Sequence, residues 1–305
     1  MNTSGPADPR PQPPAAAGGS KRRALALVWL VTLLVILATV IFAAVRTGPV
    51  PKSGFLVVSA QERGPGGPAT NTAPDAAVAL GAEIQGILSA NGGHRIGVAL
   101  VDTRSGKLQS YGDVSPYLAA STAKIITAAA YYHLVETGEK SLDTPLGDFD
   151  AAFQLKAMVN TSSDDSWLLL MQDIGYPKLI EYARSIGIEY DPEKNLLTPP
   201  EMALLLTALS TGKLLNAEHT EELLGYMQET NDEDLIPAAV APGITVHHKY
   251  GVVQGYVHDA AILGSGDRSY AVAIYTWGPD DADSADRLGI IHELTRDITG
   301  ALFRG

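Results

Sequence analysis

The feature that most constrains this chain is an apolar run of 22 residues without a single charge, Ala24–Val45. As a helix rising about 1.5 Å per residue, the run would extend roughly 33 Å, enough to cross the ~30 Å hydrocarbon core of a bilayer. Three consecutive bases at positions 21–23 precede it, and fewer bases follow it closely. By the positive-inside rule, the segment before the helix stays in the cytoplasm and the chain beyond residue 46 lies outside.

A cleaved signal peptide is the alternative to this membrane helix, but the apolar region of a signal peptide usually has only about 7–15 residues. Both alternatives export the rest of the chain. We therefore predict a disordered cytoplasmic tail at 1–23, a transmembrane helix at 24–45, a linker rich in Gly, Pro and Thr at 46–71, and an extracytoplasmic domain at 72–305. The expected location is the cell membrane, with a single pass.

The charge of the predicted domain argues against nucleic acid as a partner. The whole chain carries 22 bases and 34 acids, and residues 1–23 have a net charge of +3, so the remainder carries −15. An acidic body of this kind repels phosphate backbones and anionic membrane surfaces. The chain also has no cysteine, which excludes disulfides, thiol nucleophiles and cysteine-ligated zinc.

The pattern of the domain predicts an α/β or α+β fold with one sheet built from distant strands. An amphipathic helix at 73–90 precedes two strands, and a block of helices then separates these from three further strands and a last helix. The predicted strands cover 95–102, 107–111, 244–250, 255–264 and 269–277, and the helices between and after them cover 122–137, 150–160, 164–174, 176–186, 199–210, 217–229 and 283–302.

Ser121 and Lys124 form a candidate nucleophile and base. Lys124 is the one fixed charge in the 22 residues from Val114 to Val135, an Ala-, Ile- and Tyr-rich segment. A buried lysine is costly unless it is paired or functional, and burial lowers its pKa towards that of a useful base. A spacing of three places both side chains on one helical face, and the helix start favours negative charge on the serine oxygen. The pair therefore has the parts of an activated serine.

The alternative is a structural serine that caps the helix, followed by a lysine that extends to water. The Ser-x-x-Lys pattern is not specific by itself, because Ser210 and Lys213 repeat it at a helix end that we expect to be exposed. Histidines at 247, 248 and 258 suggest a metal site only weakly, since no His-x-x-x-His supports it, and we expect neither metal nor cofactor. The absence of Gly-x-Ser-x-Gly disfavours an α/β-hydrolase.

Three short sequence motifs, called boxes below, occur in a fixed order and are together more specific than the Ser-x-x-Lys pattern alone. The three boxes are STAK at 121–124, the polar box SSD at 162–164 and HKYG at 248–251. The strand RIGVALVD and the turn TRSGK precede the first box, and the segment VETGEKSLDTPL follows it. Over about residues 75–305 the chain resembles the class A β-lactamase and low-molecular-mass penicillin-binding protein family. The resemblance implies an α+β fold, in which the N- and C-terminal strands form an antiparallel sheet beside an all-helical subdomain.

The resemblance also implies roles for these residues. Ser121 would attack a β-lactam or peptide carbonyl and form an acyl-enzyme, with Lys124 as its base and Ser162 as a relay to the leaving nitrogen. Lys249 would attract the substrate carboxylate. Asp164, Tyr250 and Gly251 would line the substrate site, and backbone N–H groups of Ser121 and of the strand after Gly251 would form an oxyanion hole.

The chain departs from the family pattern in ways that weaken the expectation of turnover. Ser163 and Asp164 replace Asp and Asn of the second box, and Tyr250 replaces a threonine. The deacylation loop with Glu-x-x-Leu-Asn is shortened, and Glu193 is either its remnant or a solvated turn residue. We therefore expect a membrane-anchored, penicillin-interacting serine hydrolase that deacylates slowly. The alternative is a non-catalytic binding module in cell-wall processes.

Overall fold

The computed structural model describes residues 73–279 and 284–303. The predicted tail, membrane helix and linker lie outside the described residues, so the division of the chain at 1–71 stays a prediction. Within the two described ranges, no helix is both long enough and apolar enough to cross a membrane.

A five-stranded antiparallel sheet forms the centre of the domain. Its strands run in the order β2-β1-β9-β8-β7, so the first two strands of the domain pair with the last three. This confirms that distant strand groups share one sheet. The strands are β1 (Arg95–Asp102), β2 (Leu108–Gly112), β7 (Thr245–Val253), β8 (Tyr256–Ser265) and β9 (Arg268–Trp277).

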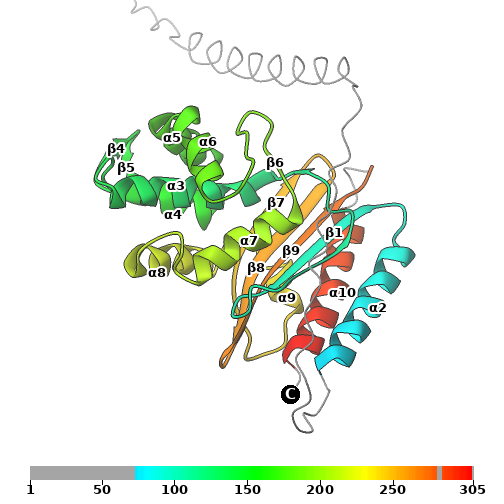
Figure 1. Cartoon of the computed structure of the whole chain (residues 1–305). Helices are drawn as coiled ribbons and strands as arrows, with labels where there is room; N and C mark the ends of the chain where they lie inside the picture. The colour runs from blue at the N-terminus through cyan, green and yellow to red at the C-terminus, as the bar shows by residue number, and fades with distance from the viewer. Residues whose placement is uncertain (1–72, 280–283, 304–305) are drawn as a thin grey trace, which may run out of the picture. The chain divides into compact units, whose positions relative to one another are not determined.

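Two helices cover one face of this sheet. They are α2 (Ala73–Ala90) and α10 (Ser284–Phe303), which lie side by side in Figure 1 and contact each other. Leu80 and Ile84 of α2 pack with large side chains of the strands, such as Leu100 and Ile274. Val78 of the same helix is 72% exposed and takes no part in the core.

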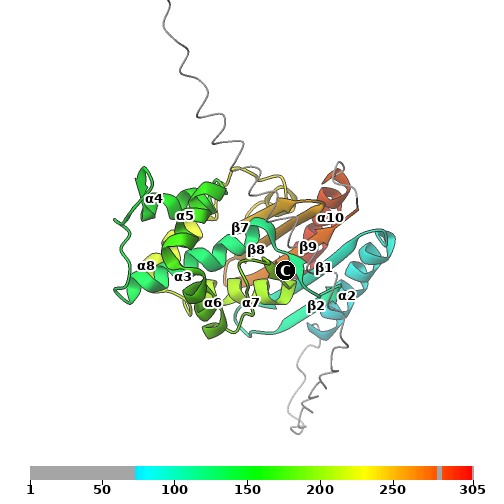
Figure 2. The same cartoon turned by 90° about the horizontal axis from the view of Figure 1, so that it is seen from above.

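The other face of the sheet carries small side chains and packs against α7 (Pro199–Ser210). Ala99, Ala260 and Ala273 lie on this face, which lets the helix approach closely. Gly97 shows how close the approach is, because a Cβ there would lie 2.9 Å from Pro199 Cγ. Helix α7 therefore connects the sheet to the helical part of the domain, as Figures 1 and 2 show.

The helical part confirms the predicted block of helices, with ends shifted by a few residues. Its first helix begins as a 3₁₀ turn, η1 (Ala120–Ala123), and continues as α3 (Lys124–Glu136). The others are α4 (Ala151–Val159), α5 (Asp164–Ile174), α6 (Tyr176–Ser185) and α8 (Ala217–Tyr226). The sequence pattern missed the short α9 (Ile236–Ala239) and two small ladders, which pair β3 (Tyr117–Leu118) with β6 (Leu196–Leu197) and β4 (Pro145–Leu146) with β5 (Phe149–Asp150).

Candidate active site

Ser121 lies in the 3₁₀ turn η1, where the chain passes from the small strand β3 into α3. The preceding residue, Ala120, has a φ of 50°, an uncommon conformation for a residue with a side chain. Ala123 is the N-cap of α3 and forms no side-chain cap. The Ser121 hydroxyl is half-buried and has no hydrogen-bond partner in the described part of the chain. Ser121 is thus not the helix cap that the structural alternative required.

Asn195 stabilises this turn through two hydrogen bonds that the sequence did not predict. Its Nδ2 donates to the Ala120 carbonyl at 3.1 Å, and its own carbonyl accepts from the Ala119 N–H at 2.8 Å. The Tyr190 hydroxyl donates to Asn195 Oδ1 at 3.1 Å. The short loop before α7 therefore holds the backbone of the nucleophile turn in place.

Lys124 is completely buried, which rules out a side chain that extends to water. Its Nζ donates to the Ser162 carbonyl at 2.7 Å, to Ser162 Oγ at 3.2 Å and to Asp164 Oδ1 at 2.6 Å. The centroid of the Trp167 ring lies 5.2 Å from the ammonium. Burial lowers the pKa of Lys124, and the hydrogen bond and charge of Asp164 oppose the shift.

Ser162 joins the two buried lysines of the site. It has a φ of 57° between α4 and α5, and its Oγ accepts from Lys249 Nζ at 3.0 Å as well as from Lys124. Lys249 is completely buried, donates also to the Tyr250 carbonyl at 3.2 Å, and lies 3.8 Å from the Tyr250 ring centroid. Burial and, second, the positive charge of Lys124 lower the pKa of Lys249 to about 7. A lysine with this pKa titrates near neutral pH, and an anion beside it would favour the cationic form.

Gly251 brings strand β7 against the nucleophile. A Cβ at this position would lie 2.9 Å from the Ser121 backbone nitrogen and 3.0 Å from the Ala120 Cβ, so only glycine fits. Strand β7 is the sheet edge, and its His248 N–H donates outward to the Met227 carbonyl at 2.8 Å. Because a strand alternates its N–H directions, the N–H of Val252 also points away from β8. Two backbone donors, on Ser121 and Val252, are thus available for an oxyanion hole.

Tyr250 does not offer a small free hydroxyl as the family threonine would. Its hydroxyl donates to Asn231 Oδ1, and Asn231 Nδ2 donates in turn to the Thr161 carbonyl at 3.1 Å. Through these two bonds, Asn231 in the loop after α8 links Tyr250 of β7 to Thr161, the residue just before the polar box. Ser163, which replaces the family Asp, caps α5 by accepting from the Ser166 N–H at 3.1 Å.

Glu193 is exposed, and its backbone N–H donates to Asp191 Oδ1 at 3.0 Å. The structure therefore favours the solvated turn residue over the remnant of a deacylating base. Lys213, the lysine of the second Ser-x-x-Lys pattern, is exposed as expected.

The buried histidines beside the site bind protein groups. His248 Nδ1 lies 3.0 Å from both carboxylate oxygens of Asp259. Burial alone would lower the pKa of His248, but the charge and hydrogen bond of Asp259 raise it. His258 accepts from the Thr276 N–H at 3.1 Å through Nδ1, so its Nε2 carries the proton and donates to the Leu118 carbonyl at 3.0 Å. His258 therefore anchors β3, and with it the nucleophile turn, to the sheet.

His258 predicts a loss of stability in mild acid. Burial lowers its pKa from 6.5 to about 4, and its ring is surrounded by Tyr117, Tyr256 and Tyr275. Because the folded pKa lies below the unfolded one, neutral His258 stabilises the fold above about pH 6.5, and this contribution disappears as the pH falls towards 4. The shift corresponds to about 3 kcal/mol.

The measurement is the free energy of unfolding at pH 7 and pH 4.5 for the wild type and for His258→Gln. The wild type should lose clearly more stability over this interval than the variant. The difference between the two proteins is the relevant quantity, since His248 titrates in the opposite sense in both. Equal pH slopes would contradict the assignment.

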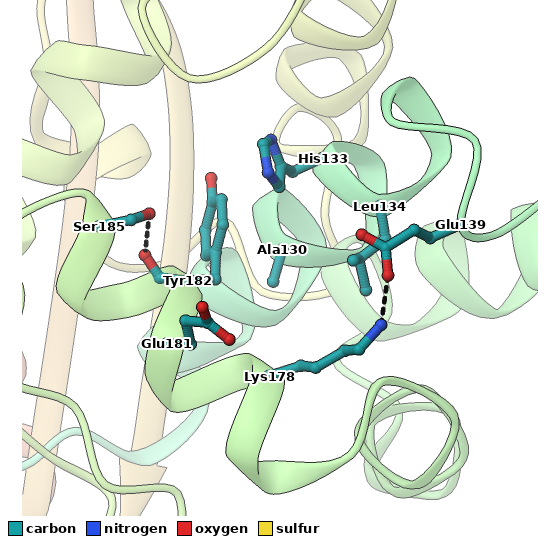
Figure 3. Close-up of a pocket in the computed structure, with 8 residues that line it drawn as sticks. All are labelled: Ala130, His133, Leu134, Glu139, Lys178, Glu181, Tyr182 and Ser185. Carbon is teal, nitrogen blue, oxygen red and sulfur yellow. Dashed lines mark hydrogen bonds and ion pairs between the residues drawn. The ribbon is translucent and has the colours of Figure 1, made fainter.

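A separate pocket of about 310 Å³ lies between α3 and α6. Figure 3 shows the Glu139–Lys178 ion pair at its edge and the Tyr182 hydroxyl, which is buried and finds no hydrogen-bond partner among residues 73–279 and 284–303. None of the predicted site residues lines this pocket, so it is not the candidate catalytic centre. Its lining consists of Ala130, His133, Leu134, Glu139, Lys178, Glu181, Tyr182 and Ser185.

Known proteins were compared with this chain by sequence and by fold. No curated protein matches the sequence. Solved structures with similar folds include a mutant of PBP-A as its acyl-enzyme complex with penicillin G, at 21% identity and a TM-score of 0.67, covering 73% of this chain and 96% of that one. An ancestral class A β-lactamase has 23% identity and a TM-score of 0.66, with 73% and 99% covered.

The model of the β-lactamase enzyme family matches residues 79–302, which include all seven predicted site residues. The boxes at 121–124, 162–164 and 248–251, separate in the sequence, lie within hydrogen-bond or van der Waals contact of one another. The chain therefore belongs to the β-lactamase enzyme family.

Proposed function

We propose that this protein is a penicillin-interacting serine hydrolase that forms an acyl-enzyme on Ser121, with a β-lactam or a peptidoglycan peptide as the acyl donor. The observation that carries the proposal is the convergence on Ser162 Oγ of Lys124 at 3.2 Å and Lys249 at 3.0 Å, while Gly251 packs on the Ser121 nitrogen. The penicillin G acyl-enzyme of PBP-A, a protein of similar fold, supports the same chemistry.

In the proposed step, Ser121 Oγ attacks the carbonyl carbon and the carbon–nitrogen bond of the donor breaks. Lys124 accepts the serine proton, directly or through the Ser162 hydroxyl. As Ser162 donates its proton to the leaving nitrogen, Lys124 returns a proton to Ser162, so that both groups end as they began. The N–H groups of Ser121 and Val252 stabilise the oxyanion. Lys249 binds the donor's carboxylate, which favours its cationic form.

The test is intact mass after incubation with a penicillin. We expect one penicilloyl adduct per chain in the wild type and none in Ser121→Ala. An adduct that persists in Ser121→Ala would place the nucleophile elsewhere. Reversible binding without any adduct would favour the non-catalytic module. That alternative is supported by Asp164, which stands where the family has an amide.

We also propose that residues 24–45 anchor the domain outside the cell membrane as a single pass. The length of the uncharged run and the three bases before it support this proposal. Protease added to intact cells should then degrade the domain and spare residues 1–23. A processed protein in the medium that lacks the run would show that it is a signal peptide.

A further inference from the structure

Asp164 is a site carboxylate that reaches solvent. Its side chain is 84% exposed, although its Oδ1 lies 2.6 Å from the Nζ of the completely buried Lys124. In the described ranges, its second oxygen accepts no hydrogen bond. One oxygen thus contacts the proposed base, while the side chain as a whole is open to solvent.

Asp164 lies at one end of a row of polar groups. The row runs from Lys249 through Ser162 Oγ and Lys124 to Asp164, with successive distances of 3.0, 3.2 and 2.6 Å. In the proposed function the donor's carboxylate binds at the Lys249 end. The acyl portion of the donor, which stays on Ser121, then extends towards Asp164.

The accessible charge at this end of the row is negative. Both lysines are completely buried and direct their hydrogens at protein oxygens. Asp165 is exposed beside Asp164 and adds a second negative charge there.

Asp164 has two roles that can be separated: it pairs with the buried Lys124, and it lies in the first turn of α5. Asp164 and Asp165 both lie in the first turn of α5, where negative charge stabilises a helix. Ser163 already caps this helix. Asp165 therefore shares the helix-dipole role but lacks the contact with Lys124, which makes it a matched control.

Building on the proposed acyl transfer at Ser121, we infer that Asp164 selects acyl donors that carry a primary ammonium in their acyl portion. An ionised carboxylate only accepts hydrogen bonds, whereas the family's amide also donates. A carbonyl oxygen of the donor is therefore repelled at Asp164, and an ammonium forms a charge-assisted hydrogen bond there, about twice as strong as a neutral one.

The experiment compares two thioester donors that share the same leaving thiol. One carries a primary ammonium in its acyl portion, and in the other this amine is N-acetylated. Acylation of the full-length chain is followed by intact mass, with loss of the thiol. We expect the ammonium donor to have a kcat/KM at least about tenfold higher in the wild type and in Asp165→Asn. In Asp164→Asn the preference should disappear. Equal acylation rates of the two donors in the wild type would overturn the inference. So would an equal loss of the ammonium preference in Asp164→Asn and Asp165→Asn.

Binding of the same donors to Ser121→Ala separates this inference from the proposed function. If neither donor acylates the wild type, the proposed acyl transfer fails. Tighter binding of the ammonium donor, removed by adding Asp164→Asn, would still support selection by Asp164. Equal binding of the two donors would overturn it.

Penicillins provide the converse prediction. Asp164→Asn restores an amide donor and keeps an oxygen for Lys124, so acylation by a neutral-side-chain penicillin should rise about tenfold or more. Asp165→Asn, which removes the same charge one residue away, should have little effect. Unchanged or slower acylation of Asp164→Asn would count against the position assigned to Asp164 in the second box.

Discussion

Replacing Lys124 by alanine should slow acylation of Ser121 by at least about 10²-fold, the lower range for loss of a positioned base. Lys124 is completely buried, and its Nζ contacts Ser162 and Asp164, so its removal takes away the base proposed for Ser121. The measurement is the second-order rate of penicillin adduct formation, with thermal unfolding of each variant beside it.

Lys213→Ala is the control for this change. Lys213 stands in the same Ser-x-x-Lys spacing, after Ser210, but it is exposed at the end of α7. Its loss should leave acylation unchanged. A fully active Lys124→Ala protein would show that Lys124 is a structural residue and would put the assignment of Ser121 in doubt.

The second large effect concerns deacylation, which we expect to be slower by about 10²–10⁴-fold than with a positioned general base. The segment between Ile186 and Thr198 is short, and its candidate base Glu193 is exposed. A reacting penicillin should therefore give one lasting adduct per chain and little hydrolysis.

Intact mass over time and the yield of hydrolysed penicillin measure this prediction together. Glu193→Gln serves as the control and should change neither quantity. Steady turnover of many penicillins per chain would contradict the prediction. If Glu193→Gln then abolished that turnover, Glu193 would be the deacylating base despite its exposure.

The local part of this protein could be predicted from its sequence. The spacing of Ser121 and Lys124 placed both on one turn because helical geometry depends only on nearby residues. The periodicity of apolar residues gave the strands and helices of the sheet and of the helical part, with errors mainly at their ends. The box at 248–251 was identified by resemblance, although the reason for Gly251, its contact with the Ser121 nitrogen, required the structure.

The contacts that define the chemistry came only from the tertiary structure. Lys124 meets Ser162 across 38 positions, Lys249 meets Ser162 across 87, and His258 holds Leu118 across 140. Because such pairs have no periodic signature in one sequence, the pairing of Asp164 with Lys124 could not be foreseen. The long apolar run by itself determined the expectation of a membrane anchor, since its length alone matches a bilayer. The fold decided where each buried charge finds its partner, since burial makes an unpaired charge too costly to keep.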